Sequence, residues 1–236
     1  MNQVVAIIAT QAKDAAEFSE RPIYKSLHRQ HDMLDLFSKY SFTYKVVYDN
    51  KRGLSEIYNE FLYNPEHRED ILLFVHDDVE LVDVFMVDRL IASPYTVTGL
   101  AGTKQANLTC KPAWHLMSAQ SEWVGEVAHS KYDEEKKNHL IWTTRFGPTQ
   151  SRALLIDGLF IAVDVKTAIK QEVKFDNDFK FHHYDMAFCL DCNHKKVKVG
   201  VMPINVIHHG LGDSMNTPEW VESAVNFTRK YAQSAA

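Results

Sequence analysis

Short apolar runs alternate with amphipathic segments over the first hundred residues. Four runs are rich in β-branched and other large apolar residues, which is typical of strands buried on both faces; they cover 4–10, 42–48, 71–75 and 97–101. Segments with apolar residues at helical spacing separate them, over 26–40, 54–63 and 84–92. This alternation predicts an α/β fold with a mostly parallel central sheet flanked by helices.

The pattern changes after Gly102. A polar and aromatic stretch runs to residue 150, with a short strand candidate near its end. Beyond it we expect a strand interrupted by Asp157-Gly158, a helix, a last strand that contains Pro203 and a closing helix, over 154–163, 184–193, 197–206 and 218–231. Proline has no amide hydrogen, so the last strand is expected at an edge or with a bulge. No repeat or linker divides residues 1–236, which favours a single domain.

Composition narrows the class of protein. Hydrophobic residues make up 45% and charged residues 24% of the chain, ordinary values for a soluble globular protein. The formal net charge of −5 argues against nucleic-acid binding, which usually needs a basic face. The apolar run 4–9 is too short to span a bilayer and no signal-like segment precedes it, so we expect no transmembrane segment and a cytoplasmic protein.

Three cysteines cannot all pair, which fits a reducing compartment. Cys189 and Cys192 form a C-x-x-C within a segment that is expected to be helical. Two interpretations stay open for this pair: a buried helix face, which we favour, and a redox or zinc site, for which no second metal-ligand pair stands nearby.

An acidic pair, Asp77-Asp78, directly follows the apolar run 71–75 and His76. Ligands of open α/β sheets bind beyond the carboxyl ends of the strands. Two adjacent carboxylates repel each other there and need a counter-charge. Mg²⁺ or Mn²⁺ supplies it, since such hard ions combine one or two carboxylates with water and phosphate oxygens. A solvated acidic loop or a helix N-cap is the alternative interpretation.

Several short motifs follow one another in a fixed order. Besides Asp77-Asp78 they are Tyr58-Asn59, the segment 97–102, Trp114, Ile156-Asp157-Gly158, Phe175-Asp176, His183-Tyr184-Asp185 and Ile207-His208. In this order, residues 45–212 resemble family 2 glycosyltransferases and a small bacterial and viral branch of them. The acidic pair is similar to their DxD motif, in an x-Asp-Asp variant. Thr10-Gln11 and Asp49-Asn50 depart from the family's Pro-Thr-Tyr-Asn and Asp-Gly-Ser.

The resemblance implies a GT-A fold, which is Rossmann-like, and a metal-dependent hexosyltransferase. Such an enzyme moves a sugar from a nucleotide-sugar donor, here expected to be a UDP-sugar, to an acceptor hydroxyl with Mn²⁺ or Mg²⁺ bound. Residues 1–102 are then expected to bind the nucleotide sugar and residues 103–236 the acceptor, whether a sugar, a lipid-linked or a protein acceptor. Inversion is favoured, because Asp185 offers a base and no separate nucleophile is evident.

The resemblance also implies metal and nucleotide ligands. Asp78 is the expected direct metal ligand and His208 a second one, with a solvent-exposed strand end as the alternative for His208. Asp77 is expected at the ribose or at a metal-bound water. Further nucleotide contacts are expected from two strand ends, one helix and an arginine: Thr10, Asp49, Asn59 and Arg152.

Asp185 is the candidate general base, by resemblance to a carboxylate of inverting relatives that takes the acceptor proton. A helix is expected to begin there, so capping is the alternative role. Asp157 is the rival base, since it stands beside Gly158, where a backbone can approach a sugar closely. Gly158 and Trp114 are expected at the acceptor, Trp114 as a stacking ring; a core tryptophan fits Trp114 equally well.

Two other functions stay open. A nucleotidyltransferase needs a glycine-rich loop after the first strand to hold a triphosphate, and residues 11–14 contain no glycine. A non-catalytic nucleotide- or sugar-binding module is the second alternative, against which Asp78, Asp185 and His208 argue.

Overall fold

The computed structural model describes residues 3–37, 39–210 and 215–232, and its larger sheet has seven strands. In spatial order they are β2 (Ser41–Val47), β1 (Gln3–Ala9), β3 (Ile71–Val75), β11 (Phe160–Asp164), β5 (Val97–Gly99), β12 (Val199–Val201) and β9 (Ser151–Arg152). β1 is parallel to β2 and to β3, and Val5 lies opposite Thr43 and Leu72. Residues 4–8 of β1 are all buried, as expected for a strand covered on both faces.

β11 separates two strands that the sequence predicts in succession. It runs antiparallel to β3 and to β5, with Ala162 opposite Leu73 and Thr98. β12 is parallel to β5, and β9 is antiparallel to β12. Most strands of this sheet therefore share one direction, while β11 and β9 run against it. The α/β class with a mostly parallel central sheet is confirmed, and the inserted antiparallel strand is the departure from the predicted series.

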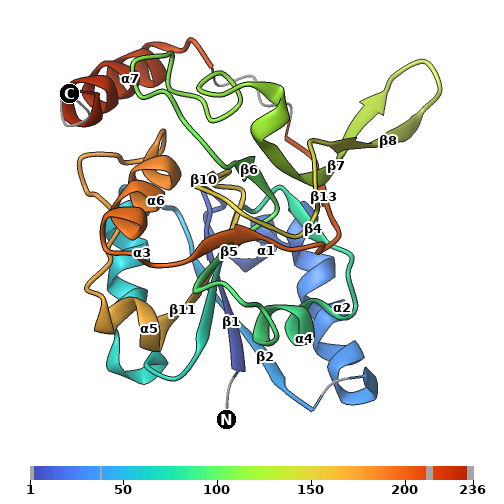
Figure 1. The fold of residues 1–236 in the computed structure, drawn as a ribbon. Helices are drawn as coiled ribbons and strands as arrows, with labels where there is room; N and C mark the ends of the chain where they lie inside the picture. The colour runs from blue at the N-terminus through green and yellow to red at the C-terminus, as the bar shows by residue number, and fades with distance from the viewer. Residues whose placement is uncertain (1–2, 38, 211–214, 233–236) are drawn as a thin grey trace.

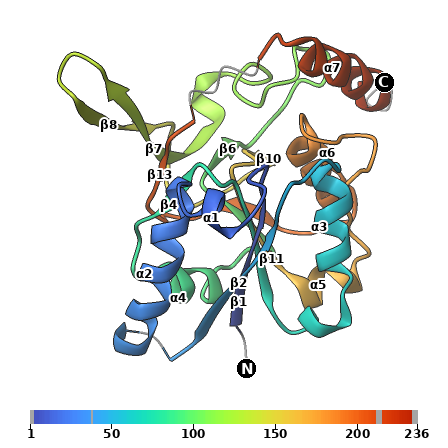
Figure 2. The same ribbon diagram turned by 180° about the vertical axis from the view of Figure 1, so that it is seen from behind.

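A smaller sheet lies beyond the carboxyl ends of the larger one (Figure 1). Its order is β10 (Leu155–Ile156), β6 (Ala101–Thr103), β7 (Trp123–Asp133), β13 (Val206–His208) and β4 (Val79–Leu81), with β8 (Asn138–Arg145) paired to β7. Short segments carry the chain between the two sheets at residues 76–78, at Leu100, at 153–154, at 157–159 and at 202–205. The β7–β8 hairpin projects from the body of the molecule in both views (Figures 1 and 2).

Helices cover both faces of the larger sheet (Figure 2). α3, α5 and α6 lie on one side and α2 and α4 on the other, as the sequence predicts. The helices are α1 (Ala15–Phe18), α2 (Pro22–Phe37), α3 (Leu54–Leu62), α4 (Met86–Ile91), α5 (Val165–Lys170), α6 (Tyr184–His194) and α7 (Pro218–Tyr231), with short 3₁₀ turns η1 (Pro65–His67) and η2 (Gln120–Glu122). Among the described residues, no helix combines the length and apolar character needed to cross a membrane.

Aromatic side chains fill the core between α3, α6 and the sheet. Phe175 stacks on Phe188 with ring centroids 3.9 Å apart, and Tyr58 stacks on Phe74 at 4.3 Å. Cys189 and Cys192 are buried in α6, so the favoured interpretation of a buried helix face is confirmed. The closing helix α7 packs through Trp220, Ala224 and Phe227, which are buried.

The prediction of a single strand over residues 197–206 is wrong. Residues 197–206 form two strands, β12 and β13, that belong to different sheets. Pro203 lies between them, neither at an edge nor in a bulge. A residue without an amide hydrogen ends a ladder, and the chain uses this point to cross from one sheet to the other.

Candidate active site

The carboxyl end of β3 carries the acidic pair to the seam between the sheets. His76 N donates to Leu159 O at 3.1 Å, so the start of this turn is fixed to the chain that leads into β11. Asp77 faces the end of β1, where the Thr10 hydroxyl donates to Asp77 Oδ2 at 2.6 Å. Arg21 Nε lies 3.5 Å from the same oxygen. Asp77 therefore joins two parallel strand ends and one cation.

Asp78 faces the other sheet. Its Oδ2 lies 3.3 Å from His208 Nε2, at the end of β13, and His209 N donates to Asp78 O at 2.9 Å. A Cβ at Gly210 would collide with both Asp78 Oδ2 and His208 Nε2. A glycine at this position thus lets the carboxylate and the imidazole pack closely against the backbone.

The Asp78–His208 pair offers two of the ligands that a metal ion needs, a carboxylate and an imidazole. Asp78 Oδ1 is buried and has no hydrogen-bond partner among the described residues, an arrangement that is costly unless a ligand completes it. No group of three or more His, Cys, Asp or Glu side chains arranged for a metal occurs in the described part of the chain. A carboxylate and an imidazole suffice where phosphate and water oxygens provide the other ligands. The residues therefore fit a divalent ion held jointly with a bound phosphate.

Electrostatics couple the two members of this pair. Burial raises the pKa of Asp78, but the hydrogen bond and charge of His208 lower it more, so the net shift is downward. Burial lowers the pKa of His208, yet the hydrogen bond and charge of Asp78 outweigh it and the net shift is upward. The two directions agree: each group favours the charged form of the other.

A second contact ties the acidic turn to α6. His76 Nε2 lies 2.9 Å from Tyr184 Oη, and that hydroxyl donates to Gly158 O at 2.8 Å. Since the hydroxyl has one proton, His76 is the donor of the first bond. A Cβ at Gly158 would meet Tyr184 Oη at 2.6 Å and Asp185 Cβ at 3.1 Å, so this position requires a glycine.

Two aspartates line the cavity, Asp157 before Gly158 and Asp185 in the helix that packs against that glycine. Asp157 is engaged on both oxygens: Trp114 Nε1 donates to Oδ2 at 3.0 Å and Leu159 N donates to Oδ1 at 3.1 Å. Asp185, in the first turn of α6, is partly buried. Burial and then the charge of Asp157 raise the pKa of Asp185 to about 7. Asp185 therefore has the pKa of a group able to accept a proton near neutrality.

These residues line one cavity of about 460 Å³, a volume typical of small-ligand sites. Its walls combine Asp78, Asp157 and Asp185 with aromatic and imidazole rings. The rings are those of His76, Trp114, His115, Phe181, His182, His183, Tyr184, His208 and Trp220. Neither lysine nor arginine is among the described residues of this wall.

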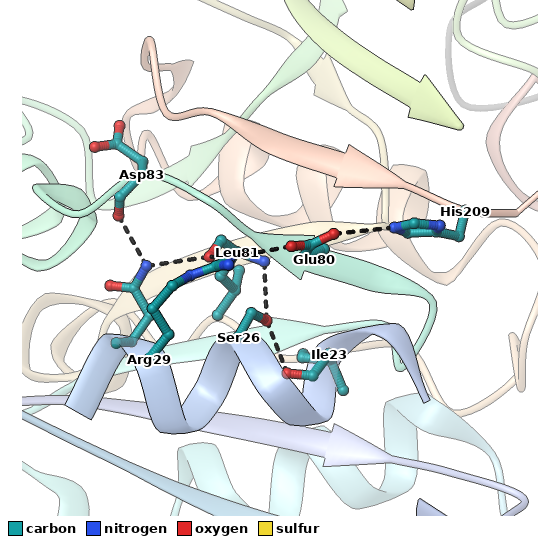
Figure 3. Close-up of polar contacts among 8 residues, drawn as sticks. Ile23, Ser26, Arg29, Glu80, Leu81, Asp83 and His209 are labelled. Atoms are coloured by element: carbon teal, nitrogen blue, oxygen red, sulfur yellow. Dashed lines mark hydrogen bonds and ion pairs between the residues drawn. The ribbon is translucent and has the colours of Figure 1, made fainter. Parts of the chain in front are cut away.

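A polar network fixes the strand that follows the acidic turn (Figure 3). Ser26 Oγ on α2 accepts from Leu81 N at 3.0 Å, which attaches β4 to the helix. Glu80 on β4 lies between Arg29, whose guanidinium donates to Oε1 at 3.1 Å, and His209, whose Nε2 lies 3.3 Å from Oε2. The network holds β4 and the end of β13 in place, and with them both sides of the Asp78–His208 pair.

The structure gathers most of the site residues that the sequence predicts. Asp78, His208, Asp157, Asp185, Trp114 and Gly158 all line the cavity. Thr10 and Asp77 are in contact beside it. Asp49 ends the neighbouring strand, where its N–H donates to Ala12 O at 2.8 Å, and its exposed carboxylate pairs with Lys51 at 3.0 Å.

Two predicted nucleotide contacts lie elsewhere. Both polar atoms of the Asn59 amide bind residue 175, accepting from Phe175 N and donating to Phe175 O at 2.8 Å each. Asn59 therefore holds that segment against α3. Arg152 lies on the edge strand β9, four strands from β3, which places it about 19 Å from the acidic pair at the usual strand spacing. The order of strands, which the sequence does not reveal, separates it from the site.

Several contributors were not predicted. Arg21 lies in a polar stretch without a recognisable pattern, although it is a basic residue after the first strand. His76 and Tyr184 each adjoin a predicted site residue, and that adjacency is the signal that could have identified them. Gly210 has a role only because Asp78 and His208 converge on it.

Comparisons with known proteins give a family and one similar structure. The model of a family described as "Glycosyltransferase like family" matches residues 17–234. No curated protein matches the chain. Among solved structures, the chain is similar to GalNAc-T7, whose crystal structure contains UDP, GalNAc and Mn²⁺, at a TM-score of 0.46 and 11% identity. The similarity covers 96% of this chain and 48% of that one, so the chain spans about half the length of this relative.

Proposed function

The chain belongs to the glycosyltransferase-like family, whose model matches nearly its whole length, and we propose that it is a GT-A type enzyme that transfers a sugar from a UDP-sugar to an acceptor hydroxyl with a divalent metal ion bound. The observation that carries this proposal is the acidic pair at the end of β3. Asp78 faces His208 with one buried oxygen unpaired, while Asp77 faces Thr10 and Arg21.

The donor occupies the carboxyl ends of β1, β2 and β3 in this proposal, as ligands of open α/β sheets do. Thr10 and Asp49 lie at the ends of adjacent strands and serve the nucleoside. Asp77 accepts from ribose or from a water. Arg21 lies beside Asp77 and replaces Arg152 as the cationic partner of the diphosphate, because a guanidinium binds phosphate oxygens with paired donors.

Asp78 and His208 would hold Mn²⁺ or Mg²⁺ together with diphosphate oxygens. When bound, the ion neutralises the charge that develops on the departing diphosphate. His208 brings a positive charge of its own when protonated, and metal binding requires it neutral. Gly210 allows Asp78 and His208 to approach each other, because any side chain at this position would collide with both.

Asp185 acts as the general base in this proposal and takes the proton of the acceptor hydroxyl. Its pKa, raised to about 7, lies where a group is ionised at neutral pH and still accepts a proton readily. Asp157 is less suited, because both its oxygens accept hydrogen bonds from Trp114 and Leu159. Asp157 instead positions the Trp114 indole at the acceptor. Attack assisted by Asp185 leads to inversion at the anomeric carbon.

The test is a thermal-shift comparison with UDP, in Mn²⁺ and in EDTA. A ligand at a hundredfold excess over its Kd stabilises a protein by about 2.7 kcal/mol, which raises Tm by roughly 5–11 °C for a chain of this size. We expect that shift with Mn²⁺ and its loss in EDTA. Asp78→Ala should abolish both the thermal shift and the hydrolysis of UDP-sugars to UDP. Asp32→Ala, which removes an exposed carboxylate on α2, should leave both unchanged. An equal shift in EDTA would refute the metal role.

A further inference from the structure

The β7–β8 hairpin carries a row of rings that begins in the active site. His208 on β13 lies opposite His129 on β7, and His129 lies opposite Trp142 on β8. Residues paired across strands present their side chains on one face of a sheet. Trp142 therefore lies on the same face as the imidazole that contacts Asp78, two strand spacings or about 10 Å away.

The rings of this row are in contact. The centroids of His208 and His129 are 5.8 Å apart with an edge-to-face arrangement. The centroids of His129 and Trp142 are 5.6 Å apart, and the two planes are tilted by 27°, so the indole is stacked on the imidazole. The row is an aromatic path out of the cavity.

Trp142 is open to solvent on the hairpin. It is 47% exposed. It lies on β8, which pairs with β7 and with no other strand of the described chain. Leu140, two residues away on the same face, is 41% exposed. Trp142 and Leu140 together give the protruding hairpin an exposed apolar face, and contiguous exposed apolar surface marks binding sites.

The chemistry of the row fits a carbohydrate. A sugar ring presents C–H groups to the negative face of an aromatic ring, and it keeps its hydroxyls in water or in hydrogen bonds. The cavity wall contains carboxylates and imidazoles and, among its described residues, no lysine or arginine, so away from the metal-bound diphosphate it favours an uncharged ligand. A nucleobase is disfavoured by position, since the strand ends that suit the donor are those of β1 and β2, in the other sheet.

We propose that the acceptor is an uncharged oligosaccharide whose terminal sugar enters the cavity while a sugar unit further along the chain stacks on Trp142. This inference rests on the proposed function, because it extends the acceptor side of the same site. The row of His208, His129 and Trp142 gives the glycan a direction, from the reacting hydroxyl outward along the hairpin. Trp142 is a specificity determinant for chain length and takes no part in the transfer itself.

Binding to an array of neutral, amino-sugar and acidic glycans, from monosaccharides to hexasaccharides, tests the proposal without requiring transfer. We expect the full chain with UDP and Mn²⁺ to retain neutral glycans and to prefer the longer ones. Trp142→Ala should weaken their binding about tenfold or more, the usual effect of removing a stacked aromatic anchor. Trp142→Phe, which retains a ring, should restore most of it.

Ile141→Ala is the matched control, since Ile141 is the next residue, is 58% exposed and faces the other side of the hairpin. It should bind glycans as the wild type does. The proposal is overturned if no glycan binds, if both variants lose binding equally, or if acidic glycans are preferred. It is also overturned if Trp142→Ala removes the UDP–Mn²⁺ thermal shift, which assigns Trp142 to the donor, or dissociates a dimer seen by light scattering. Glycan binding without any UDP–Mn²⁺ shift would instead refute the proposed donor chemistry alone.

Discussion

Replacing Asp185 by asparagine is expected to stabilise the folded protein at pH 8 while it removes activity. The pKa of Asp185 is raised from 3.8 to about 7 by burial and by the charge of Asp157. A raised carboxyl pKa means that the folded state favours the protonated form. The stability linked to that proton is complete below about pH 4 and is lost as the pH rises through about 7. Above pH 7 the wild type therefore keeps a buried charge at a free-energy cost, which asparagine does not have.

The size of the effect follows from the same shift. Three pKa units correspond to about 4 kcal/mol at 1.36 kcal/mol per unit. Asp185 is partly exposed, so solvent screens part of this energy, and asparagine also loses the favourable charge in the first turn of α6, about 0.3–1 kcal/mol. We expect a net gain of about 1–3 kcal/mol above pH 7, which raises Tm by roughly 2–12 °C for a chain of this length.

Urea unfolding at a series of pH values measures this gain. It should grow as the pH rises from about 4 to about 7 and stay constant above that value. Asp32→Asn makes the same chemical change on the exposed side of α2 and should show no such growth. In parallel, transfer should fall by roughly a hundredfold to ten-thousandfold, the range for loss of a general base. The environment assigned to Asp185 is refuted if Asp185→Asn is less stable than the wild type at pH 8, or if its gain in the free energy of unfolding does not change with pH.

Two further substitutions test the scaffold of the site. Tyr184→Phe removes the hydroxyl that binds Gly158 O and His76 Nε2 and leaves both unsatisfied, so urea unfolding at pH 7 should show a loss of about 1–3 kcal/mol; an unchanged midpoint would contradict the contact. Gly125→Ala forces a side chain into a position with φ of +91° where a Cβ would overlap Leu100 O. It should lower the free energy of unfolding by at least about 1–3 kcal/mol, and a calorimetric Tm equal to that of the wild type would refute the path of β7.

The strands of the larger sheet could be predicted where burial on both faces leaves a continuous apolar run. The run 71–75 matches β3 at both ends, and the closing helix 218–231 matches α7, since Thr217 caps it and Pro218 begins it. The insertion of β11 could not be predicted, because an apolar run in the sequence indicates neither the direction of its strand nor the strands that pair with it. β4 was missed for a simpler reason: three residues are too few to show a period.

Site residues could be predicted where the residues that identify them are neighbours in the sequence. Asp77 and Asp78 are adjacent to each other and to a buried strand, so the sequence indicates their place at the edge of the sheet. His208 lies 130 positions beyond Asp78 and was found by resemblance alone. The misplacement of Arg152 and Asn59 has one cause: their distance from the acidic pair depends on strand order and on packing against residue 175, neither of which is a local property.

The place of β11 also sets an order for synthesis. A ribosome that has released residues 1–102 has produced β1, β2, β3 and β5 but not the strand that joins β3 to β5. Until residue 164 emerges, the inner edges of β3 and β5 expose unpaired backbone groups, the surface on which strands of other chains pair and aggregate. We therefore expect residues 1–102 alone to be prone to aggregation, and the sheet to be complete between β3 and β5 only once β11 has been made.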